Sequence, residues 1–446
     1  MRGPKGLMHA YFFKRILENY ATADLELFRR YGDVVRVVAP SAQTYFFRPS
    51  HVRHILRTNV LNYRKSIHYD MLRPILGDGI FVSEGDLWTR QRRLLAPEFR
   101  ENAVARFIPP IVDCAEKLFA EWDEARRRGP IDVTADMMRL TLWIIGRAMF
   151  RSEFLRETEV IGHSLEVCLA HGTLQMMSMG LYKDWLPTRG NREAREAERA
   201  LNDAINGMIR RGRAGDLGTH DVLSRMILAR DPETGASMSD RQLLDETKSL
   251  VLAGHETTSL ALSWAFYLLS SHPEIEERLV EEATRVLGDR TPTAQDVPQL
   301  EYTRQVFFEA MRLYPPVPAV TRNAVSADVI DGIRIEPGAL VAVVPYVTHR
   351  HPEYWTNAER FDPDRFSEKR RDSIEPYSYM PFLLGRRQCL GEHFAMLEGV
   401  LLLAMIVRRY AFTRVSREPI ETRPISTLRF ARPLVMHVAD RRAQGR

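Results

Sequence analysis

The sequence predicts a mainly α protein with a smaller β region, an α+β fold. Apolar residues recur at helical spacing through most of the first three hundred positions. Short runs with the composition of strands are confined to three regions, at about 30–60, 317–345 and 410–438. No internal repeat or low-complexity segment divides the 446 residues. We therefore expect a single domain over 1–446, helix-rich outside those three regions.

The first elements along the chain are two short strands, VVRVV (Val34 to Val38) and TYFF (Thr44 to Phe47), joined by a turn at Pro40-Ser41. Amphipathic helices follow at about 101–128, 133–150, 157–171 and 191–211. The segment RRGRAGDLGTH, residues 210–220, has the composition of a flexible basic loop. More helix follows it, so it does not mark a domain boundary.

A long helix is predicted from Ser239, because Ser239 and Gln242 match the capping-box pattern S-x-x-Q. From Leu243 to Leu269 almost the only helix breaker is Gly254. That length exceeds a typical globular helix, so we expect it to run through the centre of the molecule.

Two further helices are expected in the C-terminal third, at about 299–313, before Pro315-Pro316, and from just after Cys389 to about Arg409. Strand signals surround them in AVTRNA, DVIDGIRI, LVAVVP, STLRF and LVMHV. These signals form the later part of the predicted β region.

Composition restricts the class of protein. With 63 basic and 58 acidic residues the formal net charge is +5, too small an excess to indicate a nucleic-acid partner. The three cysteines include no C-x-x-C pair, which argues against a disulfide framework and favours a reducing compartment. The N-terminus lacks a long apolar run, and Val400 to Val407 is too short to cross a bilayer. We expect a cytoplasmic protein without a membrane span.

Cys389 is distinguished by its surroundings. It lies between Gly385 and Gly391, two residues after Arg387, where the last helix begins. An isolated cysteine is more often a buried structural thiol. Here glycines allow tight turns and close approach by a flat ligand, and the helix N-terminus lowers a thiol pKa and favours a thiolate. A single thiolate does not fit structural zinc or an iron–sulfur cluster, whereas it fits haem iron held from one side.

The stretch PFLLGRRQCLGEHFA, residues 381–395, resembles the haem-binding signature of the cytochrome P450 superfamily, F-x-x-G-x-R-x-C-x-G. Leu383 departs from the pattern, since many members carry glycine there. The resemblance implies the cytochrome P450 fold, a triangular helical bundle with haem b (iron protoporphyrin IX) between the long central helix and the cysteine-loop helix. It implies that Cys389 is the metal ligand. The cofactor-binding residues that it implies in this stretch are Phe382, Arg387, Cys389, Gly391 and Ala395.

A second motif, AGHETT, lies midway along the long helix. Alone it is equally consistent with an ordinary helix face that tolerates a glycine. Its acid lies in an apolar context, however, where acids are rare unless paired or functional. The motif resembles the family's oxygen-binding stretch, A-G-x-[D/E]-T-[T/S]. By that resemblance Ala253 and Gly254 contact the cofactor, Thr257 hydrogen-bonds oxygen during activation, and Glu256 relays protons from solvent.

Two more motifs resemble family segments. EAMR (Glu309 to Arg312), alone an ordinary surface pair, and FDPDRF together imply a Glu309–Arg312–Arg365 network that supports the cysteine loop. In DLWTRQRRLL, Trp88 and Arg92 share one helix face. Alone they read as an aromatic packed under a solvated arginine. By resemblance these two bind the haem propionates, with Arg322 and Arg387 completing the set.

The resemblance implies a haem-thiolate monooxygenase that inserts one atom of dioxygen into a C–H bond or an alkene. No flavin or ferredoxin module follows the cysteine-loop helix, so electrons are expected from a separate ferredoxin or flavodoxin with its reductase. A monomer is expected. Five basic residues are expected to form a docking surface for an acidic partner near the cysteine: Arg90, Arg93, Arg386, Arg408 and Arg409.

The substrate pocket is placed by the resemblance at about 63–87, 165–190, 251–257, 317–321 and 426–428. These segments are apolar, and no arginine stands out as a carboxylate clamp. We therefore predict a lipophilic substrate, terpenoid-like first, otherwise a fatty acid, steroid or macrolide. The side chains expected to line the pocket are Ile80, Phe81, Met176, Met177, Met179, Val317, Val320 and Leu428.

Two alternative functions stay open at this point. A peroxide-driven thiolate-haem peroxygenase usually lacks the acid–threonine pair, which this chain carries at Glu256 and Thr257. A non-catalytic haem sensor needs neither that pair nor a roomy apolar pocket. Spectra and turnover with a reductant distinguish the three functions.

Overall fold

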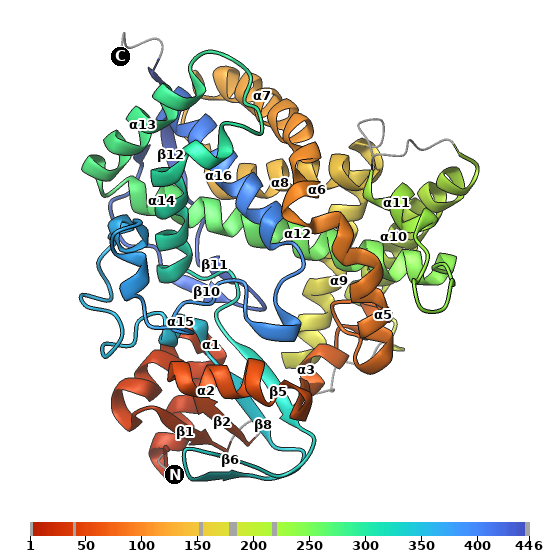
Figure 1. The fold of residues 1–446 in the computed structure, drawn as a ribbon, viewed down its shortest axis with the longest axis vertical. Helices are drawn as coiled ribbons and strands as arrows, with labels where there is room; N and C mark the ends of the chain where they lie inside the picture. Colours follow the sequence, from red (N-terminus) through yellow and green to blue (C-terminus); the bar gives the residue numbers. More distant parts are fainter. Residues whose placement is uncertain (1–2, 39–41, 151–154, 178–184, 216–220, 442–446) are drawn as a thin grey trace.

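The structure, a computed structural model, describes residues 3–38, 42–150, 155–177, 185–215 and 221–441. Helices pack around the long helix α12, and most strands gather at the end that holds the N-terminus (Figure 1). The helices are α1 Leu7–Tyr31, α2 Pro49–Arg53, α3 Ile67–Asp70, α4 Arg73–Leu76, α5 Gly85–Leu95, α6 Glu101–Val104, α7 Ile108–Ala125, α8 Val133–Phe150, α9 Leu155–Met177, α10 Arg189–Arg213, α11 Val222–Leu228, α12 Asp240–Leu269, α13 Pro273–Leu287, α14 Glu301–Leu313, α15 Pro345–Thr348 and α16 Glu392–Arg409. The strands are β1 Val34–Val37, β2 Gln43–Phe46, β3 Tyr63–Lys65, β4 Ile131–Asp132, β5 Val320–Ala324, β6 Asp328–Ile330, β7 Ile333–Ile335, β8 Leu340–Val343, β9 Tyr410–Arg414, β10 Thr422–Pro424, β11 Leu428–Phe430 and β12 Val435–Asp440.

Helix α12 confirms the predicted central helix. Its N-cap is Ser239, whose hydroxyl accepts the backbone N–H of Gln242 at 3.2 Å. The helix continues without a break through Gly254, and its 30 residues span about 45 Å. Most of them are buried, because α8, α14 and α16 all pack against it.

Four of the predicted helices, at about 133–150, 157–171, 191–211 and 299–313, are confirmed as α8, α9, α10 and α14. The helix predicted at about 101–128 is interrupted, since α6 ends at Val104 and α7 begins at Ile108, just before two prolines that favour a helix start. The segment predicted as a basic loop is helical in α10 as far as Arg213. Residues 216–220 of that loop lie outside the described residues.

The largest sheet has the strand order β1-β2-β8-β5-β3 and confirms the strands predicted near the N-terminus and in AVTRNA and LVAVVP. The turn at Pro40-Ser41 lies outside the described residues. A second sheet, β4-β12-β9, and the hairpins β6–β7 and β10–β11 complete the β region. Strands β3, β4, β9 and β10 were not predicted individually. Strands β3, β4 and β9 pair with strands that are distant in the sequence, and β10, which pairs with the nearby β11, has only three residues, so local patterns do not reveal them.

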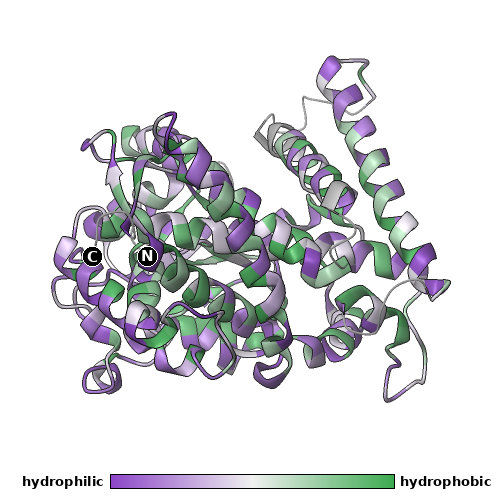
Figure 2. Cartoon of the chain, turned by 90° about the horizontal axis from the view of Figure 1, so that it is seen from above, coloured by the Kyte–Doolittle hydropathy of each residue, from purple (hydrophilic) through white to green (hydrophobic). Residues whose placement is uncertain are grey.

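The main hydrophobic core lies between α7, α8, α12, α14 and α16. Figure 2 shows green, apolar residues concentrated in the packed helices and purple, polar residues on outer turns and loops. Helix α16 is buried along almost its whole length, so it fixes the position of the loop that precedes it. Among the described residues, no helix combines the length and apolar character needed to cross a membrane.

Candidate active site

One cavity collects most of the predicted catalytic and cofactor-binding residues. It lies between one face of α12 and the loop that leads into α16. Glu256 is not among its lining residues. Those predicted residues that do line it are Trp88, Arg92, Ala253, Gly254, Thr257, Arg322, Phe382, Arg387, Cys389, Gly391 and Ala395.

The cysteine loop is held by local backbone contacts. The Cys389 N–H donates to the Phe382 carbonyl at 2.9 Å, and the Gln388 N–H donates to Gly385 at 3.1 Å. Gly385 has φ +67, and a Cβ there would lie 2.4 Å from the carbonyl oxygen of Leu56, so glycine is required. Leu383, the departure from the family pattern, has φ +58, a left-handed conformation that glycine adopts at lower cost.

Gly391 lies in the turn that precedes α16, and its φ of −89 is one that any residue adopts, so the turn does not require glycine there. A Cβ at this position would meet no protein atom within 4 Å, and the residue lines the cavity. At Cys389 the expected effect of the helix terminus competes with that of burial. Burial raises the pKa of its thiol, while the backbone N–H of Gly391 and the charge of Arg92 act in the opposite direction. The helix terminus therefore offsets a burial penalty rather than lowering the pKa outright.

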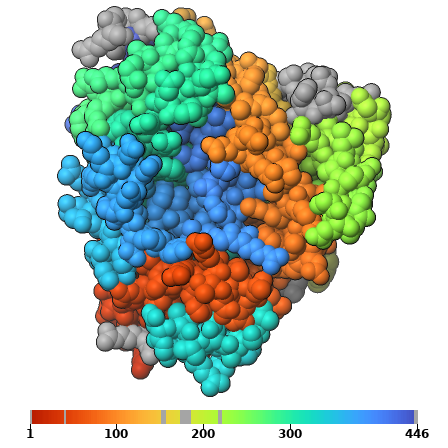
Figure 3. All heavy atoms as spheres, viewed as in Figure 1, coloured from red at the N-terminus to blue at the C-terminus, as the bar shows by residue number. Residues whose placement is uncertain are grey.

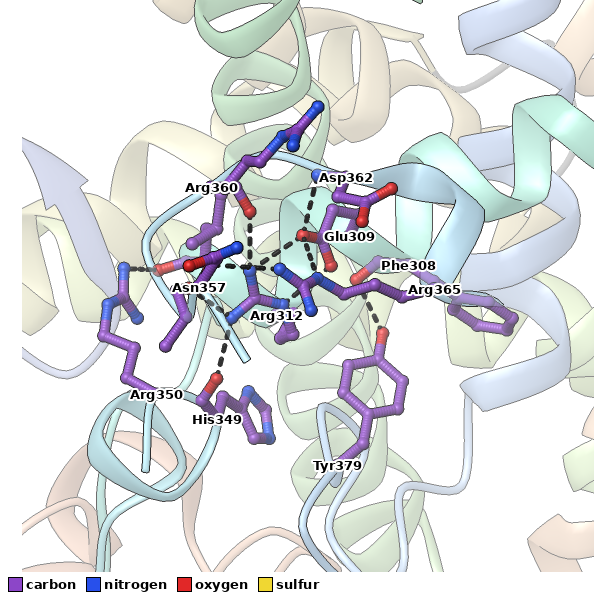
Figure 4. A network of polar contacts seen from close by, with 12 residues as sticks. Phe308, Glu309, Arg312, His349, Arg350, Asn357, Arg360, Asp362, Arg365 and Tyr379 are labelled. Atoms are coloured by element: carbon purple, nitrogen blue, oxygen red, sulfur yellow. Dashed lines mark hydrogen bonds and ion pairs between the residues drawn. The ribbon is translucent and has the colours of Figure 1, made fainter. Parts of the chain in front are cut away.

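The E-x-x-R motif is fully buried and not a surface pair. Figure 4 shows the polar contacts that it makes. Arg312 donates two hydrogen bonds of 2.7 Å to the two carboxylate oxygens of Glu309. Arg365 donates to the same carboxylate at 3.3 Å, and the backbone N–H of Asp362 donates at 3.0 Å. Such a buried network needs every donor satisfied, and it ties α14 to the segment around 357–365.

The network continues toward the cysteine loop through His349. Arg312 donates to the His349 carbonyl at 2.8 Å. The ring Nε2 of His349 accepts the backbone N–H of Met380 at 2.9 Å, just before the loop begins. Burial lowers the pKa of His349 to about 3, so the ring is neutral and can act as this acceptor. The arrangement transmits the rigidity of α14 to the start of the cysteine loop.

Four cations line the cavity: Lys65, Arg92, Arg322 and Arg387. Arg387 lies 3.8 Å from the centre of the Trp88 ring and forms an ion pair with Glu84, while its buried Nη1 has no hydrogen-bond partner. Burial lowers the pKa of Arg92, lowers that of Arg387 to about 10 and lowers that of Lys65 to about 7. A nearby anionic ligand would stabilise the charged form of these side chains and so offset the effect of burial on their pKa.

Lys65 was missed by sequence reasoning. It belongs to β3, and the antiparallel register places it opposite Arg322 of β5. Directly paired residues share a face of the sheet, so both side chains reach the cavity. Its Nζ now donates to the carbonyls of Ile80 at 2.9 Å and Ser83 at 3.1 Å. No local pattern marks this lysine, because its position follows from pairing with a distant strand.

Opposite the cysteine loop, α12 presents Ala253, Gly254 and Thr257 to the cavity. The Thr257 hydroxyl donates to the Ala253 carbonyl at 2.8 Å, the back-bond typical of threonine in a helix. A Cβ on Gly254 would lie 2.8 Å from Cδ1 of Ile145, so α8 also approaches closely at this glycine. His255 is buried and does not line the cavity.

Glu256 turns away from the cavity. Its Oε1 accepts hydrogen bonds from the Thr427 hydroxyl and from Nε of Arg429, the latter at 2.6 Å. These partners belong to the β10–β11 hairpin, which sequence reasoning connected only with the substrate pocket.

The predicted pocket residues divide into three groups. Ile80, Phe81, Val317 and Val320 line the cavity, and Tyr69 and Leu250 add to this side. Leu428 is wrong as a lining residue, because it is buried in the core below the N-terminal helix and its carbonyl accepts the Trp264 N–H at 2.9 Å. The side chains of Met176, Met177 and Met179 lie outside the described residues.

The predicted basic surface is smaller than expected. Arg90 and Arg93 form ion pairs with Asp231, and Arg409 forms one with Asp123. Arg408 and Arg409 also end α16, about 25 Å along the helix from the cysteine loop. Arg386 is exposed on the loop itself and donates to the Thr89 hydroxyl at 2.7 Å.

Comparisons with known proteins identify the class. The cytochrome P450 family model matches residues 4–436. Cyclooctatin synthase of Streptomyces melanosporofaciens is 37% identical over 80% of this chain and 77% of its own. Cyclooctat-9-en-7-ol 5-monooxygenase of the same organism is 31% identical over 85% and 82%. The crystal structure of the cytochrome P450DA heme domain superposes with a TM-score of 0.91 at 26% identity, covering 100% of this chain and 99% of that one.

This chain belongs to the cytochrome P450 family. It is a P450 monooxygenase with the P450 fold, and its cofactor is haem b. The residues present fit that cofactor. A thiol faces the cavity on one side, an open glycine-bearing helix face lies on the other, and four cations with one unsatisfied buried N–H group are available to two propionates.

Proposed function

We propose that this protein oxidises a neutral, lipophilic, terpenoid-like molecule at a C–H bond or an alkene. The observation that carries the proposal is that the Cys389 thiol and the Thr257 hydroxyl face one largely apolar cavity. The relative named for 5-monooxygenation of cyclooctat-9-en-7-ol, a lipophilic alcohol, supports this substrate class. A fatty acid, steroid or macrolide is the second choice.

The bound haem supplies oxygen activation and transfer. Cys389 holds the iron, and the surrounding network of Glu309, Arg312 and Arg365 keeps its loop rigid. Lys65, Arg92, Arg322 and Arg387, with Trp88, bind the two propionates. The hydroxyl of Thr257 would supply a proton from the α12 side of the cavity, opposite Cys389. The apolar side chains that line the cavity exclude water and orient the substrate.

Electrons come from a separate ferredoxin or flavodoxin with its reductase. The face that contains the cysteine loop is hollowed, with the blue α16 region recessed between orange and light-blue segments (Figure 3). Exposed Arg386 lies on this loop and attracts an acidic partner. The protein acts as a cytoplasmic monomer, a setting that suits its three unpaired cysteines.

The first experiment tests the haem ligand and the activity together. The reduced protein with carbon monoxide should show the red-shifted Soret band of thiolate-ligated haem, and Cys389→Ala should lose it. Terpenoids screened for a substrate-induced spin shift should then be oxidised with a ferredoxin and its reductase. Retention of the band in Cys389→Ala overturns the assignment of the ligand.

The same assay separates the alternatives. Turnover with hydrogen peroxide but never with a reductant indicates a peroxygenase. Absence of any spin shift and any product across the lipophile library indicates a haem sensor.

The docking proposal has its own test. Arg386→Glu should slow reduction by an acidic ferredoxin, most strongly at low salt, while Arg423→Glu on β10 should not. Equal rates for both variants contradict docking at the cysteine loop.

A further inference from the structure

Glu256 is the acid of the AGHETT motif, and it lies away from the cavity that the motif lines. It is 3% exposed, lies outside the cavity, and contacts a hairpin more than 170 residues further along the chain. Both donors from that hairpin, the Thr427 hydroxyl and the Arg429 guanidinium, reach the same oxygen, Oε1. The carboxylate is therefore fixed from one side, directly beside Thr257 in the sequence.

Arg429 differs from a simple packing residue in its exposure. Its side chain is 38% exposed, although the carboxylate that it contacts is buried. The guanidinium of Arg429 therefore contacts solvent on one side and the buried carboxylate of Glu256 on the other, at the β10–β11 hairpin. The preceding residue, His255, is also buried, and burial lowers its pKa, so it is neutral and adds no cation.

We propose that Arg429 is a positioning residue for proton delivery, an inference that rests on the proposed monooxygenase function. With Thr427 it fixes Glu256 and keeps that acid within reach of solvent at the hairpin. Glu256 takes a proton from water and passes one toward Thr257, so it ends each cycle unchanged. Electrons come only from the redox partner, and Arg429 itself neither gains nor loses a proton.

Loss of the guanidinium has a specific consequence. A buried carboxylate without its cation is neutralised or turns away, and in either state it supplies protons late. If protons do not arrive through Glu256 and Thr257 in time, dioxygen that has received two electrons from the redox partner takes two protons from water and leaves as hydrogen peroxide, so reductant is consumed without product. The expected signature is a change in the ratio of peroxide to product at unchanged haem content.

The test uses the full haem-loaded chain with a ferredoxin, its reductase and a lipophile identified by its spin shift. Arg429→Gln should raise peroxide released per product roughly tenfold, a part of what a positioned proton donor contributes. It should also enlarge the solvent deuterium isotope effect on product formation. Arg429→Lys, which restores a cation, should recover most of the coupling.

Arg423 provides a matched control. It pairs with Arg429 across the hairpin, so both side chains lie on the same face, and Arg423 is exposed. Arg423→Gln removes a nearby charge without the contact to Glu256, and it should leave the ratio unchanged. Equal ratios for Arg429→Gln and Arg423→Gln, or no rescue by Arg429→Lys, overturn the proposal.

A second readout does not depend on turnover. In urea unfolding of the protein, Arg429→Gln and Glu256→Gln should be non-additive, because either change removes the same contact. Additive effects contradict the pairing.

If Arg429→Gln does not fold, Thr427→Val removes the other donor to Glu256 and should also raise peroxide release. If the wild-type protein lacks the red-shifted Soret band of thiolate-ligated haem, or forms no product, the proposed function is contradicted. If the wild-type protein forms product with little peroxide and the variants keep the same ratio of peroxide to product, only this inference is contradicted.

Discussion

Arg312→Lys is the sharpest test of the buried network below the cysteine loop. Arg312 is fully buried and uses all five of its N–H donors, two to Glu309 and one each to the carbonyls of His349, Ala358 and Arg360. A lysine offers three donors from one point. At least two of those acceptors must then remain unpaired in the interior.

The expected loss follows from that count. Each unpaired buried polar group costs about 1–3 kcal/mol, so two cost about 2–6 kcal/mol. Removal of one partner from a buried ion pair costs about 3–5 kcal/mol, in agreement with this range. We expect Arg312→Lys to lower the free energy of unfolding by about 4 kcal/mol and to speed haem loss, because the cysteine loop loses its support.

The assay is urea unfolding followed by tryptophan fluorescence and by the Soret band. Arg278→Lys is the control, because Arg278 also forms a bidentate pair, with Asp364, but their side chains are 51% and 43% exposed. That exposed pair should contribute less than about 1 kcal/mol. If both variants lose the same stability, the reasoning is refuted. If Arg312→Lys does not fold, Arg365→Lys, which disrupts two contacts, should give an intermediate loss.

Three other predictions concern single sites. Lys65→Met should speed transfer of haem to an acceptor protein about tenfold, because loss of one charge-assisted hydrogen bond changes a rate by about that factor. Lys65→Arg keeps the cation and should leave the transfer rate unchanged. Gly399→Ala should destabilise the protein by at least about 1–3 kcal/mol, because the added Cβ would lie 2.2 Å from the Phe307 ring. The control Gly207→Ala, on the open face of α10, should stabilise the protein, because alanine favours a helix more than glycine does. Thermal unfolding compares the two variants. Burial raises the pKa of Glu246 from 4.5 to about 8, so the folded chain keeps a proton that the unfolded chain releases, and stability should fall as pH rises from 4.5 through 8. Glu246→Gln should flatten that fall in urea titrations at several pH values; an unchanged slope contradicts the assignment.

Much of the site was predictable because its signals are local. The Ser239 cap and the uninterrupted apolar pattern predicted α12, and the spacing around Cys389 predicted a one-sided thiolate ligand at the start of α16. These patterns depend on backbone sterics, helix periodicity and capping, which act between residues a few positions apart. The roles assigned to the individual site residues stay predictions that the proposed variants test.

The tertiary structure decided where distant side chains meet. The register of β3 against β5 brought Lys65 to Arg322, and the β10–β11 hairpin brought Arg429 to Glu256 across 173 positions. Glu309 and Arg312 look like an ordinary helix pair in the sequence, but the tertiary structure buries them in a network in which their polar atoms are hydrogen-bonded. The sequence by itself predicted the haem ligand, and it determined the central helix and, through the family motifs, the class of chemistry. Strand pairing and burial determined the number of cations at the cavity, the partner of Glu256 and the support of the cysteine loop, because those depend on contacts that no local pattern encodes.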